Sequence, residues 1–195
     1  TAESCTGGLI ASMMTREPGS SAVFGYGFVT YANTAKRDLV GVSSDVLRTH
    51  GAVSEPVVQA MLAGALSRSG ADIGVAVSGV AGPDGGSEEK PVGTVWIAWG
   101  SMEDTATVRL QIPAERSVFQ QLVAALGLDR DCLVMQPHGV WQHLTQGLIR
   151  FHDMLIKRSA CHALRAQELL NEYAWVGDVI TQINRCRSSI RRHAA

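Results

Sequence analysis

The clearest pattern of apolar and polar positions lies between Ser54 and Gly70. Apolar side chains recur there at spacings of about three and four residues, which is typical of a helix that buries one face. The positions are Val57, Val58, Met61, Leu62, Ala65 and Leu66. Ser54 is a suitable N-cap, Pro56 suits the first turn, and Gly70 ends the pattern. The sequence therefore predicts a helix here that packs against a sheet.

Four shorter segments have the composition of strands. Residues 73–77 and 94–99 are rich in apolar side chains, and residues 28–31 combine aromatic and β-branched ones. Residues 105–112 alternate apolar and polar side chains, as a half-buried strand does. We therefore expect at least four strands in the first part of the chain.

Three further segments have the features of helices. The first covers residues 7–14. The second begins with Asn33 or Thr34 as its cap and ends at Leu39. The third covers residues 115–126. Strands interleaved with helices of these lengths indicate a sheet that is covered by helices. The sequence therefore predicts a three-layer α/β/α sheet domain over residues 1–128.

The rest of the chain, residues 129–195, has no strand pattern of comparable quality. Its apolar residues step by about three or four and predict two or three helices. They are Val140, Leu144, Leu148, Phe151 and Leu155, followed by Val176, Ile180 and Ile183. Glycine also becomes scarce, because 17 of the 20 glycines precede residue 129. Two interpretations stay open, a helical C-terminal appendage of unknown role or a terminus from an altered reading frame.

Composition and charge narrow the classes of function. Hydrophobic residues make up 46% of the chain and charged residues 18%, which fits a soluble and compact protein. A formal net charge of -1 provides no overall field for nucleic acid or an anionic membrane, so we expect neither as a partner. No run approaches the roughly 18 apolar residues of a spanning helix. The four cysteines lack paired spacing, which favours free thiols in the cytoplasm.

The first candidate for chemistry is the opening run TAESCTGG, which precedes a predicted helix. The first amides of a helix have no internal partner and lie at the positive end of its dipole, so an oxyanion beside Ser4 would be stabilised. Two other interpretations stay open. Serine and threonine before a helix are often N-caps, and Cys5 is either a competing nucleophile or a small buried side chain.

The second candidate is the run TYANTAK, which spans residues 30–36. Tyr31 and Lys36 are spaced so that both side chains can reach one point above the edge of the sheet. A desolvated, neutral lysine can take a proton from a serine, and a nearby tyrosine hydroxyl can orient that proton. The residues alone favour a simpler interpretation, in which Lys36 is a solvated helix residue and Tyr31 a strand aromatic with its hydroxyl in water. His50 is the only histidine of this part and suits a helix C-terminus, so a Ser-His-Asp triad is disfavoured.

The third candidate is the glycine-rich loop from Ser78 to Gly93, which follows a predicted strand. Ligands of open α/β sheets usually bind at the carboxyl ends of strands, where successive amides can surround an anion. The loop contains neither a P-loop nor a dinucleotide fingerprint, and a purely structural role stays open. Glu88 and Glu89 have no further ligand at a suitable spacing, so we expect no metal.

Five segments occur in a consistent order along the first part of the chain. They are residues 2–8 (AESCTGG), 18–21 (PGSS), 29–36 (VTYANTAK), 51–54 (GAVS) and 78–93. Together they resemble the CinA C-terminal family, the nicotinamide-nucleotide amidohydrolases, whose members are also called competence/damage-inducible proteins. The resemblance covers residues 1–112 and can be followed to residue 128.

The resemblance implies an amidohydrolase of pyridine nucleotide salvage. Such an enzyme hydrolyses the carboxamide of nicotinamide mononucleotide to nicotinic acid mononucleotide and ammonia, so a small nucleotide is the expected partner. By the matching motifs, Ser4 is the implied nucleophile, assisted by Tyr31 and Lys36, and no cofactor is needed. For this substrate we expect the amides of Thr6, Gly7 and Gly8 to stabilise the oxyanion. The best candidate for binding the phosphate is the loop with Gly79, Gly82, Gly85 and Gly86.

The chain departs from the family pattern at two places. The helix and strand that precede the Glu-Ser-Cys run in the family are missing, so we expect an N-terminally truncated domain with an exposed sheet edge. Residues 114–116 read Ala-Glu-Arg where the family has Gly-Asp-Arg. The missing strand leaves one alternative function, a catalytically inactive nucleotide-binding module of the same fold. We also expect a homo-oligomer.

Overall fold

The computed structural model describes residues 1–16 and 18–135 of the chain. Residues 136–195, which hold the apolar stripes of the predicted appendage, lie outside the described residues, so the appendage stays a prediction. The described residues form five strands and five α-helices, with one short 3-10 helix at Ser20–Ala22. They confirm the predicted α/β fold.

The strands form one mixed sheet in the order β2-β1-β3-β4-β5. Their bounds are β1 Ala2–Glu3, β2 Phe28–Val29, β3 Gly74–Gly79, β4 Thr94–Gly100 and β5 Thr105–Gln111. β1 pairs in parallel with β2 on one side and β3 on the other, whereas β3, β4 and β5 pair antiparallel. The carboxyl end of β1 therefore lies in the interior of the sheet, where ligand sites of such folds are found.

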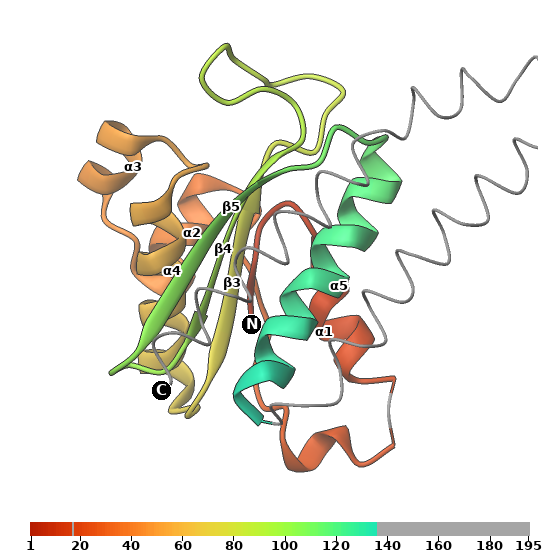
Figure 1. The fold of residues 1–195 in the computed structure, drawn as a ribbon. Helices are drawn as coiled ribbons and strands as arrows, with labels where there is room; N and C mark the ends of the chain where they lie inside the picture. The colour runs from red at the N-terminus through yellow and green to blue at the C-terminus, as the bar shows by residue number, and fades with distance from the viewer. Residues whose placement is uncertain (17, 136–195) are drawn as a thin grey trace, which may run out of the picture. The chain divides into compact units, whose positions relative to one another are not determined.

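Helices cover both faces of the sheet (Figure 1). One face carries α1 (Leu9–Met14) and α5 (Arg116–Met135), and the other carries α2 (Asn33–Val40), α3 (Ser44–His50) and α4 (Glu55–Ser69). The apolar stripe of α4 is buried as predicted. It packs on Ala2, Ala76 and Ala98, which lie side by side across three strands. These short side chains let α4 lie close to the sheet.

Two elements were not predicted, and one is longer than predicted. β1 has only two residues, too few for an alternating pattern, and it leads directly to Ser4. The predicted truncation before it stays a prediction. α3 was missed because none of its residues is buried and so no apolar stripe marks it. α5 continues to Met135, beyond the predicted end at residue 126. Among the described helices, none is both long and apolar enough to cross a membrane.

Close packing of α2 against α4 depends on Gly64. A Cβ atom at this position would overlap the carbonyl group of Val40, the last residue of α2. We therefore expect Gly64→Ala to lower the free energy of unfolding by about 3 kcal/mol, because the helices would have to separate. Denaturant unfolding measures this loss. Gln59→Ala, an exposed site of the same helix, is the control, and equal stability of both variants would contradict the prediction.

Candidate active site

Alternation along β1 directs Glu3 and Ser4 to opposite faces of the sheet. Ala2 packs on the side of α4, so Ser4 faces the side of α2 and α4, whereas Glu3 faces α1. The neighbouring strands hold this segment, because the amide of Ser4 donates to Val77 and the amide of Thr30 donates to Glu3. Ser4 is therefore fixed at the carboxyl end of an interior strand.

Lys36 meets Ser4 from α2. Side chains of a helix point back toward its N-terminus, which sends Lys36 toward the end of β2 and the turn that holds Ser4. Its Nζ donates to Ser4 Oγ at 2.9 Å, to the carbonyl oxygen of Thr30 at 2.8 Å and to that of Tyr31 at 3.3 Å. Lys36 is only 1% exposed and Ser4 7% exposed. The structure thus brings together two of the three predicted catalytic side chains.

Burial changes the acid–base behaviour of Lys36. Loss of hydration lowers the pKa of its ammonium from 10.5 to about 8, while the nearby Cys5 acts weakly in the opposite direction. Within the described residues, no carboxylate forms an ion pair with Lys36. Roughly one amine in ten would be neutral at pH 7, compared with a few in ten thousand for an ordinary lysine. Lys36 is therefore suited to accept a proton.

Glu3 has a structural role that the sequence analysis missed. Its buried carboxylate accepts hydrogen bonds from the amides of Gly8, Ile10 and Ala11 at 2.8 to 3.1 Å, and from the hydroxyl of Thr6 at 2.7 Å. It therefore caps α1 in place of the predicted Ser or Thr cap, and it offsets the positive end of the helix dipole. An acidic residue shortly before a glycine-rich helix start was the available signal.

The side chain of Tyr31 does not join Ser4 and Lys36. Tyr31 is 58% exposed, and its hydroxyl accepts a hydrogen bond from Nη2 of Arg116 at 2.8 Å. Nη1 of the same arginine donates to the carbonyl oxygen of Gly82. Tyr31 contacts Lys36 through its main-chain carbonyl oxygen, which accepts a hydrogen bond from Nζ. Arg116 therefore links the start of α5 to the glycine-rich loop and to Tyr31, a connection that the sequence analysis did not identify.

Two interpretations were left open for Cys5, a competing nucleophile or a small buried side chain. The structure supports the second, because Cys5 is buried. Burial raises the pKa of its thiol to about 12, although the amides of Cys5 and Thr6 and the charge of Lys36 act in the opposite direction. A thiol of this pKa is almost entirely protonated at neutral pH and is a poor nucleophile.

Cys5→Ala is therefore expected to retain the hydrolytic rate within about threefold, because only packing changes. Steady-state assays of the purified variant measure this. A loss as large as that of a Ser4 variant would instead identify Cys5 as part of the reaction.

Two of the three predicted oxyanion donors already have acceptors. The amide of Gly7 donates to the carbonyl oxygen of Ser4, and the amide of Gly8 donates to Glu3. For the amide of Thr6, no oxygen acceptor is found among the described residues. Thr6 is thus the member of the predicted set whose amide has only a weak acceptor beside it, the thiol of Cys5.

The glycines of the loop after β3 have packing roles. A Cβ at Gly79 would lie 2.8 Å from the carbonyl oxygen of Thr94, one at Gly82 would lie 2.6 Å from Val92, and one at Gly86 would lie 2.8 Å from the Val92 amide. Gly85 has φ +88 and open space around it. Within the described part of the chain, the amides of Gly82, Gly85 and Gly86 donate no hydrogen bond, so they remain available to an anion.

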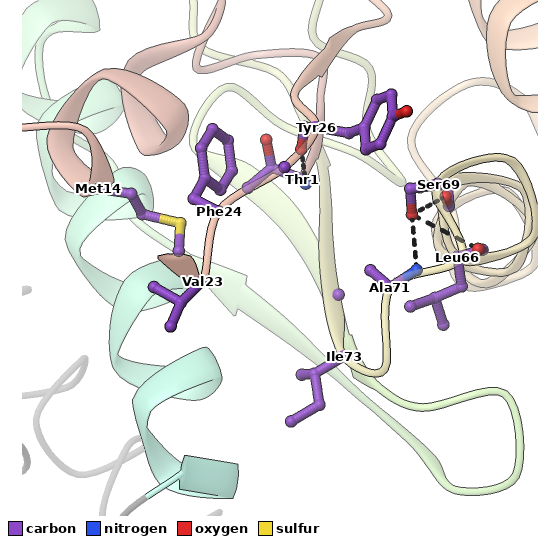
Figure 2. A pocket seen from close by; sticks show the side chains of 12 residues that line it. Thr1, Met14, Val23, Phe24, Tyr26, Leu66, Ser69, Ala71 and Ile73 are labelled. Atoms are coloured by element: carbon purple, nitrogen blue, oxygen red, sulfur yellow. Dashed lines mark hydrogen bonds between the residues drawn. The ribbon is translucent and has the colours of Figure 1, made fainter. Parts of the chain in front are cut away.

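A separate pocket of about 60 Å³ lies near the start of β1 and β3 (Figure 2). Its lining includes Thr1, Tyr26 and Leu66, and Ser69 binds the carbonyl groups of its own helix there. Ser4 follows the opposite end of β1. This pocket therefore does not contain the serine and lysine pair.

Comparison with known proteins identifies the family of the chain. The CinA C-terminal domain model matches residues 1–132. The "CinA-like protein" of Akkermansia muciniphila is 57% identical over 129 residues, covering 66% of this chain and 31% of that protein. The "Nicotinamide-nucleotide amidohydrolase PncC" of Enterobacter agglomerans is 52% identical over 128 residues, covering 65% of this chain and 78% of that protein. The chain thus spans less than a third of the CinA-like relative but most of the shorter amidohydrolase.

Solved structures have the same fold. The competence/damage inducible protein CihA from Agrobacterium tumefaciens is 44% identical with a TM-score of 0.67, covering 69% of this chain and 83% of that one. A CinA superfamily protein from Escherichia coli is 36% identical with a TM-score of 0.64, covering 66% of this chain and 75% of that one. With the family model matching residues 1–132 and solved relatives of the same fold, the chain belongs to the CinA C-terminal domain family.

Proposed function

We propose that the chain is a nicotinamide-nucleotide amidohydrolase, which converts nicotinamide mononucleotide to nicotinic acid mononucleotide and ammonia. Relatives with that enzyme name, at 52% and 57% identity, support the activity. The observation that carries the mechanism is the buried 2.9 Å contact between Lys36 Nζ and Ser4 Oγ. The alternative of an inactive binding module is not favoured, because similar relatives carry the name of an enzyme.

The two carbonyl groups near Lys36 orient its lone pair. A neutral amine has two N–H groups, and the carbonyl oxygens of Thr30 and Tyr31 can accept both. The remaining lone pair is then directed at the hydroxyl of Ser4. In its charged form Lys36 donates a hydrogen bond to Ser4 Oγ. In its neutral form the direction is reversed, and the hydroxyl of Ser4 donates to Nζ of Lys36. This geometry is what a general base requires.

The reaction then proceeds by covalent catalysis. Ser4 Oγ bonds to the carboxamide carbon while its proton moves to Nζ of Lys36, and the carbonyl oxygen becomes an oxyanion. The C–N bond breaks as Lys36 returns the proton to the departing nitrogen, which leaves as ammonia. Water attacks the resulting ester and gives its proton to Lys36. The C–Oγ bond breaks, and Oγ recovers a proton from Lys36.

The rest of the substrate requires two further contacts. We assign the oxyanion to the amide of Thr6, because the amides of Gly7 and Gly8 have oxygen acceptors, whereas the amide of Thr6 has only the weakly accepting thiol of Cys5. We assign the 5′-phosphate to the free amides of Gly82, Gly85 and Gly86, near which the guanidinium of Arg116 supplies positive charge. The hydroxyl of Tyr31, held by Arg116, would then act at the mouth of the site rather than on Ser4.

The rate should depend on pH through Lys36. Its neutral form is the base, so kcat/KM is expected to rise about tenfold per pH unit below a pKa of about 8 and then to level off. Ammonia and nicotinic acid mononucleotide are measured together from about pH 6 to about pH 9, with circular dichroism as the check on folding. A flat profile would contradict the lysine base, and the absence of both products would contradict the activity itself.

A further inference from the structure

We propose that Gln120 is a positioning residue for the nucleophile turn, an inference that rests on the proposed function. Gln120 lies in α5, and its Nε2 donates to the carbonyl oxygen of Cys5 at 2.8 Å. Cys5 directly follows Ser4. The contact joins residues that are 115 positions apart in the sequence.

The start of α5 is held firmly enough to direct this side chain. Phe119 is fully buried, and its ring lies beside Gly79 at the end of β3. Arg116 binds the carbonyl group of Gly82 in the loop that follows. Two anchors within the first turn therefore fix the position from which Gln120 reaches Cys5.

The neighbouring carbonyl groups of the turn accept hydrogen bonds from main-chain amides. Ser4 accepts from the amide of Gly7, Thr6 accepts from the amide of Leu9, and Glu3 accepts from the amide of Thr30. The carbonyl group of Cys5 is different, because among the described residues its donor is a side chain, that of Gln120. Loss of that donor would leave a carbonyl group of the buried turn without a partner and free to tilt.

The direction of this carbonyl group also sets the direction of an amide. The C=O of Cys5 and the N–H of Thr6 belong to one planar trans peptide unit, so they point in opposite directions. When Gln120 holds the carbonyl group toward α5, the amide of Thr6 points away from α5. This is the amide that we assign to the oxyanion. Gln120 therefore acts on the reaction through the peptide unit and does not touch the substrate.

The test compares variants of Gln120 with a matched control in the full chain. Gln120→Met keeps the length but has no donor, and Gln120→Glu keeps the shape while its carboxylate only accepts. Both are expected to lower kcat about 10- to 100-fold with KM within about twofold, because a misdirected donor acts mainly on the transition state. Gln120→Arg, which retains N–H donors, should recover most of the rate. Gln121→Met changes an exposed neighbour of the same helix and should leave kcat unchanged.

A second readout separates this inference from the proposed function. The rate at which a fluorophosphonate labels Ser4 needs no nucleotide, but it does need an oriented oxyanion donor. Slower labelling of Gln120→Met, together with an unchanged melting temperature, would support positioning. Unchanged labelling and unchanged kcat in both donor-free variants would overturn it. If the parent chain released no ammonia, the proposed function would fail, and the labelling rates would still decide the role of Gln120.

Discussion

Ser4→Ala is expected to reduce ammonia release from nicotinamide mononucleotide at least about a thousandfold while the fold persists. Without the hydroxyl no acyl-enzyme can form, and Lys36 has no proton to accept. The fold persists because Ser4 supplies one of three acceptors to Lys36, and the carbonyl groups of Thr30 and Tyr31 remain. Binding of the nucleotide should therefore survive the substitution.

Initial rates of ammonia release and calorimetric binding of the nucleotide measure both parts of this prediction. Ser69→Ala is a suitable control, because the hydroxyl of Ser69 donates to the carbonyl oxygen of Ala65 near the C-terminal end of α4 and makes no contact with Lys36 among the described residues. The control should keep the parental rate. If Ser4→Ala retained more than about a tenth of the rate, Ser4 would not be the nucleophile.

Lys36→Met is expected to abolish ammonia release without lowering the free energy of unfolding at neutral pH. The activity is lost because the base is lost. Stability is retained because a lysine with a pKa lowered from 10.5 to about 8 opposes folding at pH 7, and methionine relieves that cost. The carbonyl groups of Thr30 and Tyr31 lose their donor in the variant, which offsets part of the gain.

The stability effect has a definite dependence on pH. Between about pH 8 and about pH 10.5 the unfolded lysine binds more protons than the folded one, so the parent gains stability as the pH rises through this window. We expect a gain of about 2 to 3 kcal/mol from pH 7 to pH 10.5, which the Met variant lacks. Urea unfolding of both proteins at several pH values measures the difference. Parallel curves would indicate that Lys36 is not desolvated.

Much of the fold could be predicted because its largest elements carry long patterns. The stripe of α4 and the alternation of β5 extend over enough residues to be recognised, and both are confirmed. β1 and α3 could not be recognised, since two residues show no period and α3 places only two half-buried apolar residues, Val46 and Leu47, against the core. What identifies β1 is pairing with Ala76 and Phe28, which only the folded chain brings beside Ala2.

The sequence could indicate which residue types form the site. It could not indicate the directions in which their side chains point. Residue chemistry made Ser4 and Lys36 candidates, the family resemblance selected them, and the structure places them in contact. Tyr31 lies beside the buried Thr30 in the sequence, but its own side chain is exposed and bonded to Arg116. The contacts of Arg116 and Gln120 join distant segments, so no local pattern could reveal them.

The two faces of β1 have a consequence for how this segment can change. Glu3 stabilises the start of α1 on one face, while Ser4 meets Lys36 on the other. Insertion or deletion of a single residue before Ser4 would reverse this assignment, sending a carboxylate toward the lysine and a hydroxyl toward the helix start. The chemistry of this segment therefore depends on its length as well as on its residues, and the number of residues before Ser4 is fixed.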